Sequence, residues 1–365
     1  MQEQKVTGSS GADFFGSTAG RLIISLVVPL AALFVLYAGF LFLRDSTAPQ
    51  YVITLVAIAW GVGGVALLFY VANWVVERLP RDWMTRLQPF VFIGPAVLLL
   101  GWYLAIPTIR TLSLSFFNAD GSQFVGLDNY IAVFTQRNMQ EALRNNLLWM
   151  FFGTAFTVSA GLFIAILADR SRFERVAKSL IFLPMAISMV GAGVIWKFVY
   201  DFNPNIGLLN AGVTTLGGQP QAWLSQVQPW NNLFLIIVMV WLQTGYAMVL
   251  LSAAIKGIPD ELLEAARVDG ATEVQAFFRI IIPNIAGTLL TVITTVVIFT
   301  LKIFDIVIVM TGGQYGTDVI GVRFYREMFS NRNQGYGAAI AIVLLIAVVP
   351  VMIYNLRQFG KRDVF

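Results

Sequence analysis

The sequence predicts an all-α, polytopic membrane protein of about eight transmembrane helices. First, 58% of the residues are hydrophobic and only 12% are charged, whereas a soluble domain is about half apolar and about a quarter charged. Second, apolar runs of membrane-spanning length recur along the whole chain, so no large soluble domain fits between them. Third, cysteine and histidine are both absent. Their absence removes disulfides, thiolate nucleophiles, imidazole bases and the commonest zinc ligands, so we expect neither a catalytic residue nor a metal site.

Windows of membrane length divide the chain into its spans. We expect them at Leu22–Leu43, Tyr51–Val76, Phe90–Ile109, Leu147–Leu167, Leu180–Val199, Leu233–Ala254, Ile285–Met310 and Ala338–Tyr354. Residues 1–20 are polar and rich in glycine and serine. They are interpreted as a cytoplasmic tail, because a signal peptide would place its charged and apolar regions at the start.

The positions of lysine and arginine predict the orientation. Basic clusters follow the second, fourth and eighth spans, which places these loops and both termini in the cytoplasm. The clusters are Arg78, Arg81 and Arg86, then Arg170, Arg172, Arg175 and Lys178, then Arg357, Lys361 and Arg362. The loop from 255 to 283 then also lies in the cytoplasm. Arg323, Arg326 and Arg332 are an exception, because they fall in a loop that this orientation places outside. We keep the orientation, since one helix more or fewer would place the other basic loops outside.

The outer loops carry local structure. Residues 117–121 and 126–130 have the composition of turns, and residues 140–146 that of a short surface helix leading into the fourth span. Thr311-Gly312-Gly313-Gln314 is also interpreted as a turn. Trp223 and Trp230 border the outer loop from 201 to 228, where aromatic side chains mark the bilayer interface or contact a soluble partner.

A polar helical hairpin at residues 256–283 separates the sixth and seventh spans. Pro259 suits the first position of a helix that begins at about Ile258, with Asp260 and Glu261 at the positive end of its dipole. Gly270 is expected to end that helix in a left-handed conformation.

The second half of the hairpin is expected to form another helix. Thr272 and Gln275 have the spacing of a capping box that begins it, and Pro283 closes it before the seventh span. Its apolar residues recur at i, i+3, i+4 and i+7, and are Val274, Phe277, Phe278 and Ile281.

The hairpin also carries a recognisable spacing. Glu264-Ala265-Ala266, then Asp269-Gly270, then Ile280 and Pro283 give the pattern E-A-A, three residues, G, nine residues, I-x-(aliphatic)-P. This pattern resembles the loop by which permease subunits of bacterial ABC importers engage their ATPase subunits. Small Ala265 and Ala266 leave the helix thin enough for a groove on another protein, where Glu264 can meet an arginine. The alternative is an amphipathic loop on the membrane surface, with Glu264 paired to Arg267.

The chain resembles the binding-protein-dependent sugar permeases of ABC importers, the group with the maltose-type membrane subunits. The similarity covers roughly Phe90 to Arg357. It implies two additional N-terminal helices at 21–88, a six-helix permease domain at 89–357 and a cytoplasmic tail at 358–365. Supporting matches lie at Gly126–Tyr130, Phe304-Asp305, Met310–Gly313 and Gly335–Ala339. Met189–Lys197 and Trp241–Gly245 resemble α-glucoside permeases most.

The resemblance implies partners in a bacterial inner membrane. An extracytoplasmic sugar-binding protein would deliver an α-glucoside, a related disaccharide or a glucosylated polyol. A second homologous permease subunit would complete the path, with membrane lipid around both and no nucleic acid involved. Two ABC ATPase subunits would bind ATP and magnesium, because this chain has no G-x-x-x-x-G-K-(S/T) phosphate loop and no cofactor of its own. The chain itself would be a non-catalytic transport subunit.

Polar residues in the sixth and seventh spans are candidates for the substrate path, because ionisable groups in a membrane usually face a bundle interior or a water-filled path. Lys302 and Asp305 stand three residues apart on one face, with Thr300 nearby. An ion pair between helices is the structural alternative for the first two. The sixth span adds Trp241, Gln243, Thr244 and Tyr246. In related permeases, Leu242, Gln243, Thr300 and Ile303 match cavity-lining positions, although Ile303 stands where a polar group is usual.

Other classes of function fit less well. A secondary transporter would show broken helices in paired repeats, and the hairpin at 256–283 would have no role in it. An intramembrane enzyme would need a positioned nucleophile, base or metal. An ABC permease for a non-sugar small polar solute remains the nearest alternative.

Overall fold

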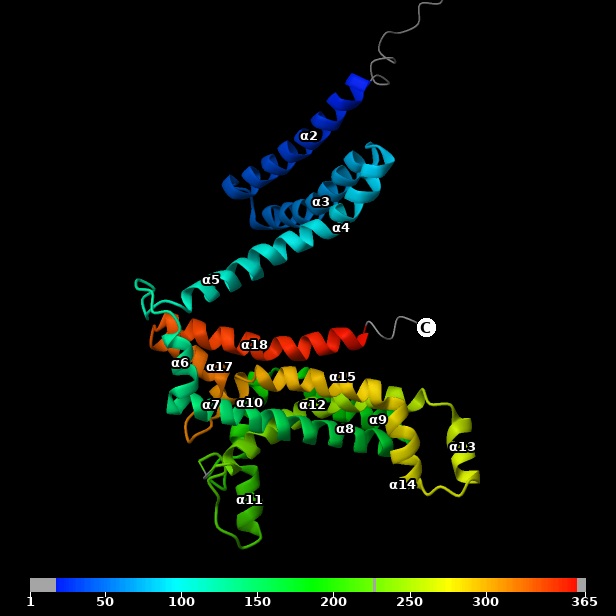
Figure 1. Ribbon diagram of the computed structural model, residues 1–365, viewed down its shortest axis with the longest axis vertical. Coiled ribbons are helices and arrows are strands. Elements are labelled where there is room, and N and C mark those ends of the chain that lie inside the picture. Colours follow the sequence, from blue (N-terminus) through cyan, green and yellow to red (C-terminus); the bar gives the residue numbers. More distant parts are fainter. Residues whose placement is uncertain (1–17, 226–227, 360–365) are drawn as a thin grey trace, which may run out of the picture. The chain divides into compact units, whose positions relative to one another are not determined.

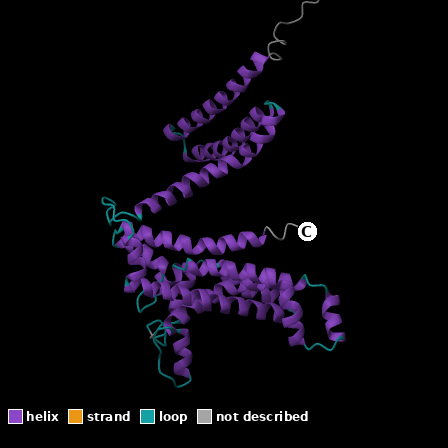
Figure 2. Ribbon diagram, viewed as in Figure 1, coloured by secondary structure: helices purple, strands orange, loops and turns teal. Residues whose placement is uncertain are grey.

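The computed structural model describes residues 18–225 and 228–359, and it is helical almost throughout (Figures 1 and 2). No strand occurs in this described part; Phe117 and Phe124 form an isolated β-bridge. The chain divides into two compact units, residues 1–108 and 109–365. The all-α class predicted from composition is confirmed. The predicted tails at 1–20 and 358–365 lie mostly outside the described residues.

The first unit consists of long apolar helices. They are α2 (Thr18–Asp45), α3 (Gln50–Glu77) and α4 (Arg81–Leu100), which continues through the π-helical η1 (Gly101–Ala105) into α5 (Ile106–Leu114). A glycine allows α2 and α3 to approach closely, because a Cβ at Gly39 would lie 2.2 Å from the Trp60 ring. The Trp60 indole N–H also donates to the Leu36 carbonyl at 2.9 Å. Small residues at such contacts are typical of helix packing in membranes.

The second unit holds the remaining helices (Figure 1). In chain order they are α6 (Asp128–Thr135), α7 (Arg137–Leu148), η2 (Trp149–Gly153), α8 (Thr154–Asp169), α9 (Glu174–Phe182), η3 (Leu183–Ala186), α10 (Met189–Val199), α11 (Leu208–Thr215), α12 (Trp230–Lys256), α13 (Asp260–Val268), α14 (Glu273–Ala276), η4 (Phe277–Ile281), α15 (Ile282–Leu301), α16 (Asp305–Met310), α17 (Ile320–Tyr325), η5 (Arg326–Ser330) and α18 (Gln334–Phe359).

The core of the second unit is centred on α12. This helix packs against α8, α15 and α10, and its side chains Leu235, Met239 and Leu251 are fully buried. Gly161 of α8 allows the closest approach, since a Cβ there would lie 2.5 Å from the Ala247 Cβ. A smaller apolar cluster joins α6 and α7 to α18 through side chains that include Met139 and Ile340.

Within residues 18–225 and 228–359, seven helices are long and apolar enough to cross a membrane, and a bent pair can form an eighth, which agrees with the predicted number of spans. That pair is the fifth predicted span. Instead of one helix at Leu180–Val199, it consists of Glu174–Ala186 and Met189–Val199 at an angle of 102°. The helix restarts because the Ser188 hydroxyl accepts the Gly191 N–H at 3.0 Å, as an N-cap does.

The seventh predicted span, Ile285–Met310, is also wrong at its end. The helix stops at Leu301, and α16 begins separately at Asp305. The predicted turn at 117–121 is confirmed, with a positive φ angle at Gly121. The predicted turn at 126–130 is confirmed only at its start, where Gly126 has a positive φ angle, because α6 begins at Asp128. The short helix predicted at 140–146 is part of α7, which continues without a break through η2 into α8.

Candidate functional site

The first helix of the hairpin, α13, begins and ends on specific backbone geometry. Pro259 has extended φ and ψ angles and is the N-cap, so α13 starts at Asp260 and not at Ile258. Gly270 has a φ of 81°, as expected for a left-handed cap. The Ala271 N–H donates to the Ala266 carbonyl at 2.9 Å and the Gly270 N–H to the Arg267 carbonyl at 3.1 Å. These two bonds form a Schellman motif, which ends the helix sharply.

The second helix begins as predicted but does not end as predicted. The Gln275 N–H donates to the Thr272 hydroxyl at 3.3 Å, and the Thr272 N–H donates to the Gln275 side chain at 2.8 Å, which completes the capping box. The helical chain then runs without interruption from Glu273 to Leu301. Pro283 does not close it; this proline lies in the first turn of α15, directly after the π-helical η4.

The residues of the E-A-A pattern are presented outward. Glu264 and Ala265 are exposed, while Ala266 is buried against the rest of the hairpin. Asp269, Gly270 and Pro283 are also exposed, and Ile280 is half-buried. Glu264 forms no hydrogen bond or ion pair with any described residue, and Arg267 pairs with Glu273 at 3.4 Å instead. The alternative pairing of Glu264 with Arg267 is therefore wrong.

A cavity of about 550 Å³ lies between the hairpin and α8. Leu162, Phe163 and Ile166 of α8 line one side, and Leu263 and Phe277 of the hairpin are among the side chains opposite. Arg170, Arg267 and Glu273 lie on its wall, and the Glu273 carboxylate pairs with both guanidinium groups. The hairpin is therefore connected to α8 mainly at these charged side chains.

The predicted path residues of the sixth span belong to α12 and are largely buried. The Thr244 hydroxyl donates to the Val240 carbonyl at 2.6 Å, and the Trp241 ring packs edge-on against Trp196 at 5.7 Å. Gln243 is buried, and its Oε1 has no partner within the described structure. Leu242 is buried in the apolar cluster and Tyr246 packs against it. An unpaired buried amide oxygen is uncommon and favours Gln243 as a functional group of this helix.

The predicted path residues of the seventh span are not brought together. Thr300 is fully buried, and its hydroxyl donates to the Val297 carbonyl at 2.9 Å. Lys302 is exposed and ends α15, whereas Asp305 is half-buried in the first turn of α16. No ion pair joins them in the part of the chain that the structure describes. The prediction that they share one helical face is wrong, because the helix breaks between them.

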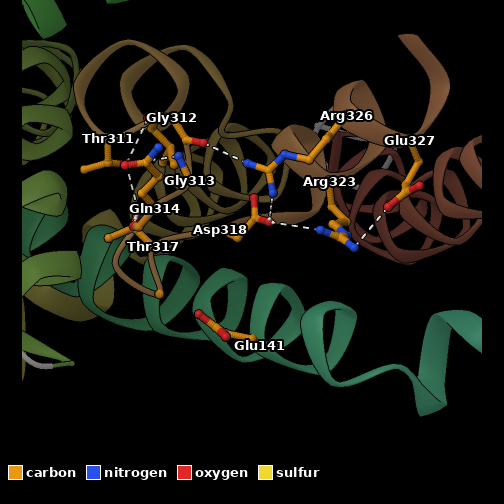
Figure 3. A network of polar contacts seen from close by, with 12 residues as sticks. Glu141, Thr311, Gly312, Gly313, Gln314, Thr317, Asp318, Arg323, Arg326 and Glu327 are labelled. Atoms are coloured by element: carbon orange, nitrogen blue, oxygen red, sulfur yellow. Dashed lines mark hydrogen bonds and ion pairs between the residues drawn. The ribbon is translucent and has the colours of Figure 1, made fainter. Parts of the chain in front are cut away.

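A buried charged network in the loop after α16 was not predicted (Figure 3). Asp318 accepts from Arg326 at 2.9 Å and lies 3.7 Å from Arg323, which pairs with Glu327 at 3.0 Å. Burial raises the pKa of the Asp318 carboxyl, although Arg326 and Arg323 oppose this effect. The i, i+4 spacing of Arg323 and Glu327 was the available signal. Two of the three arginines that contradicted the orientation rule are thus neutralised by acidic partners.

The loop itself turns at residues 311–314, as predicted. Gly312 and Gly313 have φ angles of 63° and 75°, and the Gln314 N–H donates to the Thr311 carbonyl at 3.1 Å. The Arg326 guanidinium donates to the Gly312 carbonyl at 2.8 Å, which fixes the turn to η5 (Figure 3).

Buried asparagines hold this loop to the bundle and were also missed. Asn145 donates to the Asp318 carbonyl at 2.7 Å, and Asn231 donates to the Tyr315 carbonyl at 2.6 Å. Asn145 and Asn146 on α7, and Asn231 and Asn232 on α12, are all buried. Adjacent asparagines at the ends of apolar helices were the signal, since buried amides need partners.

Comparisons with known proteins place this architecture in a family. The family model described as "binding-protein-dependent transport system inner membrane component" matches residues 157–359. The osmoprotective compounds uptake permease protein GgtC of Synechocystis sp. is 55% identical over 277 residues, 75% of this chain and 99% of the relative. The alpha-glucoside transport system permease protein AglF of Rhizobium meliloti is 47% identical over 282 residues, 76% of this chain and 84% of the relative.

A solved structure has the same fold. A chain of a bacterial ABC transporter involved in the import of the acidic polysaccharide alginate superposes with a TM-score of 0.66 at 21% identity, covering 78% of this chain and all of that one. The family match and the two relatives define a permease subunit of an ABC importer. The chain belongs to the family of binding-protein-dependent transport system inner membrane components.

Proposed function

We propose that this chain is the permease subunit through which an ATP-driven importer moves α-glucosides or glucosylated polyols across a bacterial inner membrane. The observation that carries the proposal is the hairpin 256–283, whose E-A-A residues are exposed and whose Glu264 has no partner among the described residues. An exposed carboxylate on a thin helix suits an arginine on another subunit. The relatives named for alpha-glucosides and for osmoprotective compounds support the cargo.

The proposal includes an orientation. Both termini and the hairpin lie in the cytoplasm, as the lysine and arginine positions predict. The pairing of Arg323 and Arg326 with Asp318 and Glu327 supports it, because these outer arginines are compensated locally. One of two ATPase subunits then binds at the hairpin; the two subunits supply ATP and magnesium, while this chain performs no catalysis. A second permease subunit completes the path and a binding protein delivers the solute.

The names of two relatives suggest two kinds of cargo. One relative is named for α-glucosides and another for osmoprotective compounds. A glucosylated polyol satisfies both descriptions, since it is a glucoside and a compatible solute. Gln243, buried with an unpaired amide oxygen, supports a cargo rich in hydroxyl groups. A non-sugar polar solute is the second candidate, and it draws support from the osmoprotectant name alone.

Uptake competition tests the proposal. The complete importer is reconstituted in vesicles, and radiolabelled glucosyl-glycerol uptake is measured against unlabelled disaccharides, glucosylated polyols and glycine betaine. Competition by glucosides but not by betaine supports the proposal. Competition by betaine alone would overturn the cargo assignment. Glu264→Ala serves as the transport-deficient control, because its membrane insertion should be normal.

A further inference from the structure

One carboxylate joins three separate segments at the hairpin. Glu273 is the first residue of α14, and its side chain lies 2.8 Å from the Arg170 Nη2 and 3.4 Å from the Arg267 Nε. Arg170 directly follows α8, and Arg267 lies in the last turn of α13. Glu273 therefore connects the helix that carries Glu264 to the end of α8.

The residue next to Arg170 belongs to a second charged cluster. Asp169 ends α8 and accepts from Lys178 of α9 at 2.5 Å and from the Ser252 hydroxyl of α12 at 2.8 Å. Glu174 accepts from Lys178 at 2.6 Å and also from Lys256 at the end of α12. This cluster, formed by Asp169, Glu174, Lys178, Ser252 and Lys256, ties the ends of α8, α9 and α12 together.

The two groups of charges differ in exposure. In the cluster, the side chains of Lys178 and Asp169 are 19% and 12% exposed. The side chains of Arg170 and Glu273 are 64% and 59% exposed. An exposed ion pair adds little stability and is screened by salt. The cluster is therefore suited to stay fixed, whereas the Glu273 pairs position the hairpin without adding much to the stability of the fold.

Close packing does not replace the Glu273 pairs. The cavity of about 550 Å³ separates much of the hairpin from Leu162, Phe163 and Ile166 of α8. A space of this size means that the hairpin lacks the continuous apolar contact that would carry it along with α8. In the described structure, the ion pairs that link α13 to the end of α8 run through Glu273.

We infer that Glu273 is a positioning residue that transmits movement of α13 to the ends of α8, α9 and α12, through Arg267 on one side and Arg170 on the other. The inference rests on the proposed function, in which α13 is the helix that an ATPase subunit moves. Loss of the Glu273 charge would leave the subunits assembled but let α13 move without α8. ATP hydrolysis would then continue with less solute carried for each ATP.

Charge exchange tests this role in the complete reconstituted importer. Glu273→Arg is made alone, Arg170→Glu and Arg267→Glu are made together, and all three substitutions are then combined; for each variant, solute uptake is divided by ATP hydrolysed. Glu273→Arg and the double variant should each lower this ratio by about threefold or more, and the triple variant should recover at least about half of the loss, because it restores opposite charges in both pairs. Arg175→Glu is the matched control, because Arg175 is exposed nearby on α9 and has no ion-pair partner in the described structure.

Two further measurements separate the possible failures. Co-purification of the ATPase subunits with the wild-type chain tests the proposed function alone, and its absence would remove the basis of both proposals. If the subunits bind but Glu273→Arg keeps the wild-type ratio, or the triple variant stays as poor as the others, the role of Glu273 is overturned. Raising the salt concentration should lower the ratio in the wild type more than in Glu273→Gln, because the variant lacks the carboxylate whose two ion pairs salt screens.

Discussion

The Asn146 side chain accepts the buried backbone N–H of Ile320 at 2.8 Å. Its amide nitrogen also donates to the Leu301 carbonyl at 3.1 Å. A single side chain of α7 thus pairs with one backbone group in the last turn of α15 and one in the first turn of α17, on either side of α16. Without Asn146, the Leu301 carbonyl and the Ile320 N–H would be buried without this partner. The pairing therefore stabilises the break after the seventh span.

We expect Asn146→Ala to destabilise the protein by about 1–3 kcal/mol for each backbone group left buried and unpaired. Asn146→Asp should also destabilise the protein, because its carboxylate still accepts from Ile320 but is buried and cannot donate to the Leu301 carbonyl. Thermal unfolding of the purified chain in detergent measures both. Asn138→Ala on the same helix is the control, since Asn138 is exposed. Equal midpoints for Asn146→Ala and Asn138→Ala would contradict this role.

The sequence predicted the spans because composition and length decide which segments are apolar enough to cross a membrane. It predicted the caps at Gly270 and Thr272 because these depend on residues within one turn of the chain. It failed at the break after Leu301 and at the bend beside Ser188. The break depends on partners distant in sequence, and the bend depends on a single hydroxyl within an apolar run. A hydropathy average over many residues shows neither feature.

The candidate site divides in the same way. The hairpin residues were found because their spacing is local. The supposed pair of Lys302 and Asp305 assumed a continuous helix and is wrong for that reason. The network of Asp318, Arg323, Arg326 and Glu327 depends on how a loop folds back on itself, which spacing alone does not show.

Gly161 should tolerate no larger residue. Gly161→Ala would place a Cβ 2.5 Å from the Ala247 Cβ and 2.9 Å from the Met248 backbone nitrogen. Separating α8 from α12 to relieve this overlap should cost about 1–3 kcal/mol. Gly212→Ala on α11 is the matched control, because a Cβ there meets nothing within 4 Å. Thermal midpoints of the two variants should differ clearly, and a Gly161→Ala midpoint as high as that of Gly212→Ala would refute the close packing.

Asp318→Asn should keep or slightly raise the thermal midpoint at neutral pH. Burial raises the pKa of Asp318, so folding favours the protonated carboxyl relative to the unfolded chain. The stability that protonation contributes is present at low pH and lost as the pH rises through the raised pKa. The difference between Asp318→Asn and the wild type should therefore shrink on acidification. A lower midpoint for the variant at neutral pH would show that the arginine pairs outweigh the burial cost.

Lys302 and Asp305 should act independently in transport. We expect Asp305→Ala to abolish uptake, as the resemblance to sugar permeases implies. Additivity is tested with Asp305→Asn, which retains part of the activity if the carboxylate is not essential. In the double variant, the free-energy effects of Asp305→Asn and Lys302→Ala on uptake should add to within about 0.5 kcal/mol. Uptake rates of the single and double variants provide this comparison. Strong non-additivity would indicate an ion pair between the two residues in the working importer.

We expect the hairpin at 256–283 to contact an ATPase subunit in the assembled importer. The chain contains no cysteine, so Ala265→Cys introduces one reactive thiol at the exposed E-A-A helix. In the assembled importer, a short thiol cross-linker should join this position to the ATPase subunit, and Glu264→Ala should reduce the product. Leu216→Cys is the control, because Leu216 is 89% exposed beyond α11 and is predicted to lie outside. Cross-linking from position 216, or none from position 265 in an intact complex, would contradict the account.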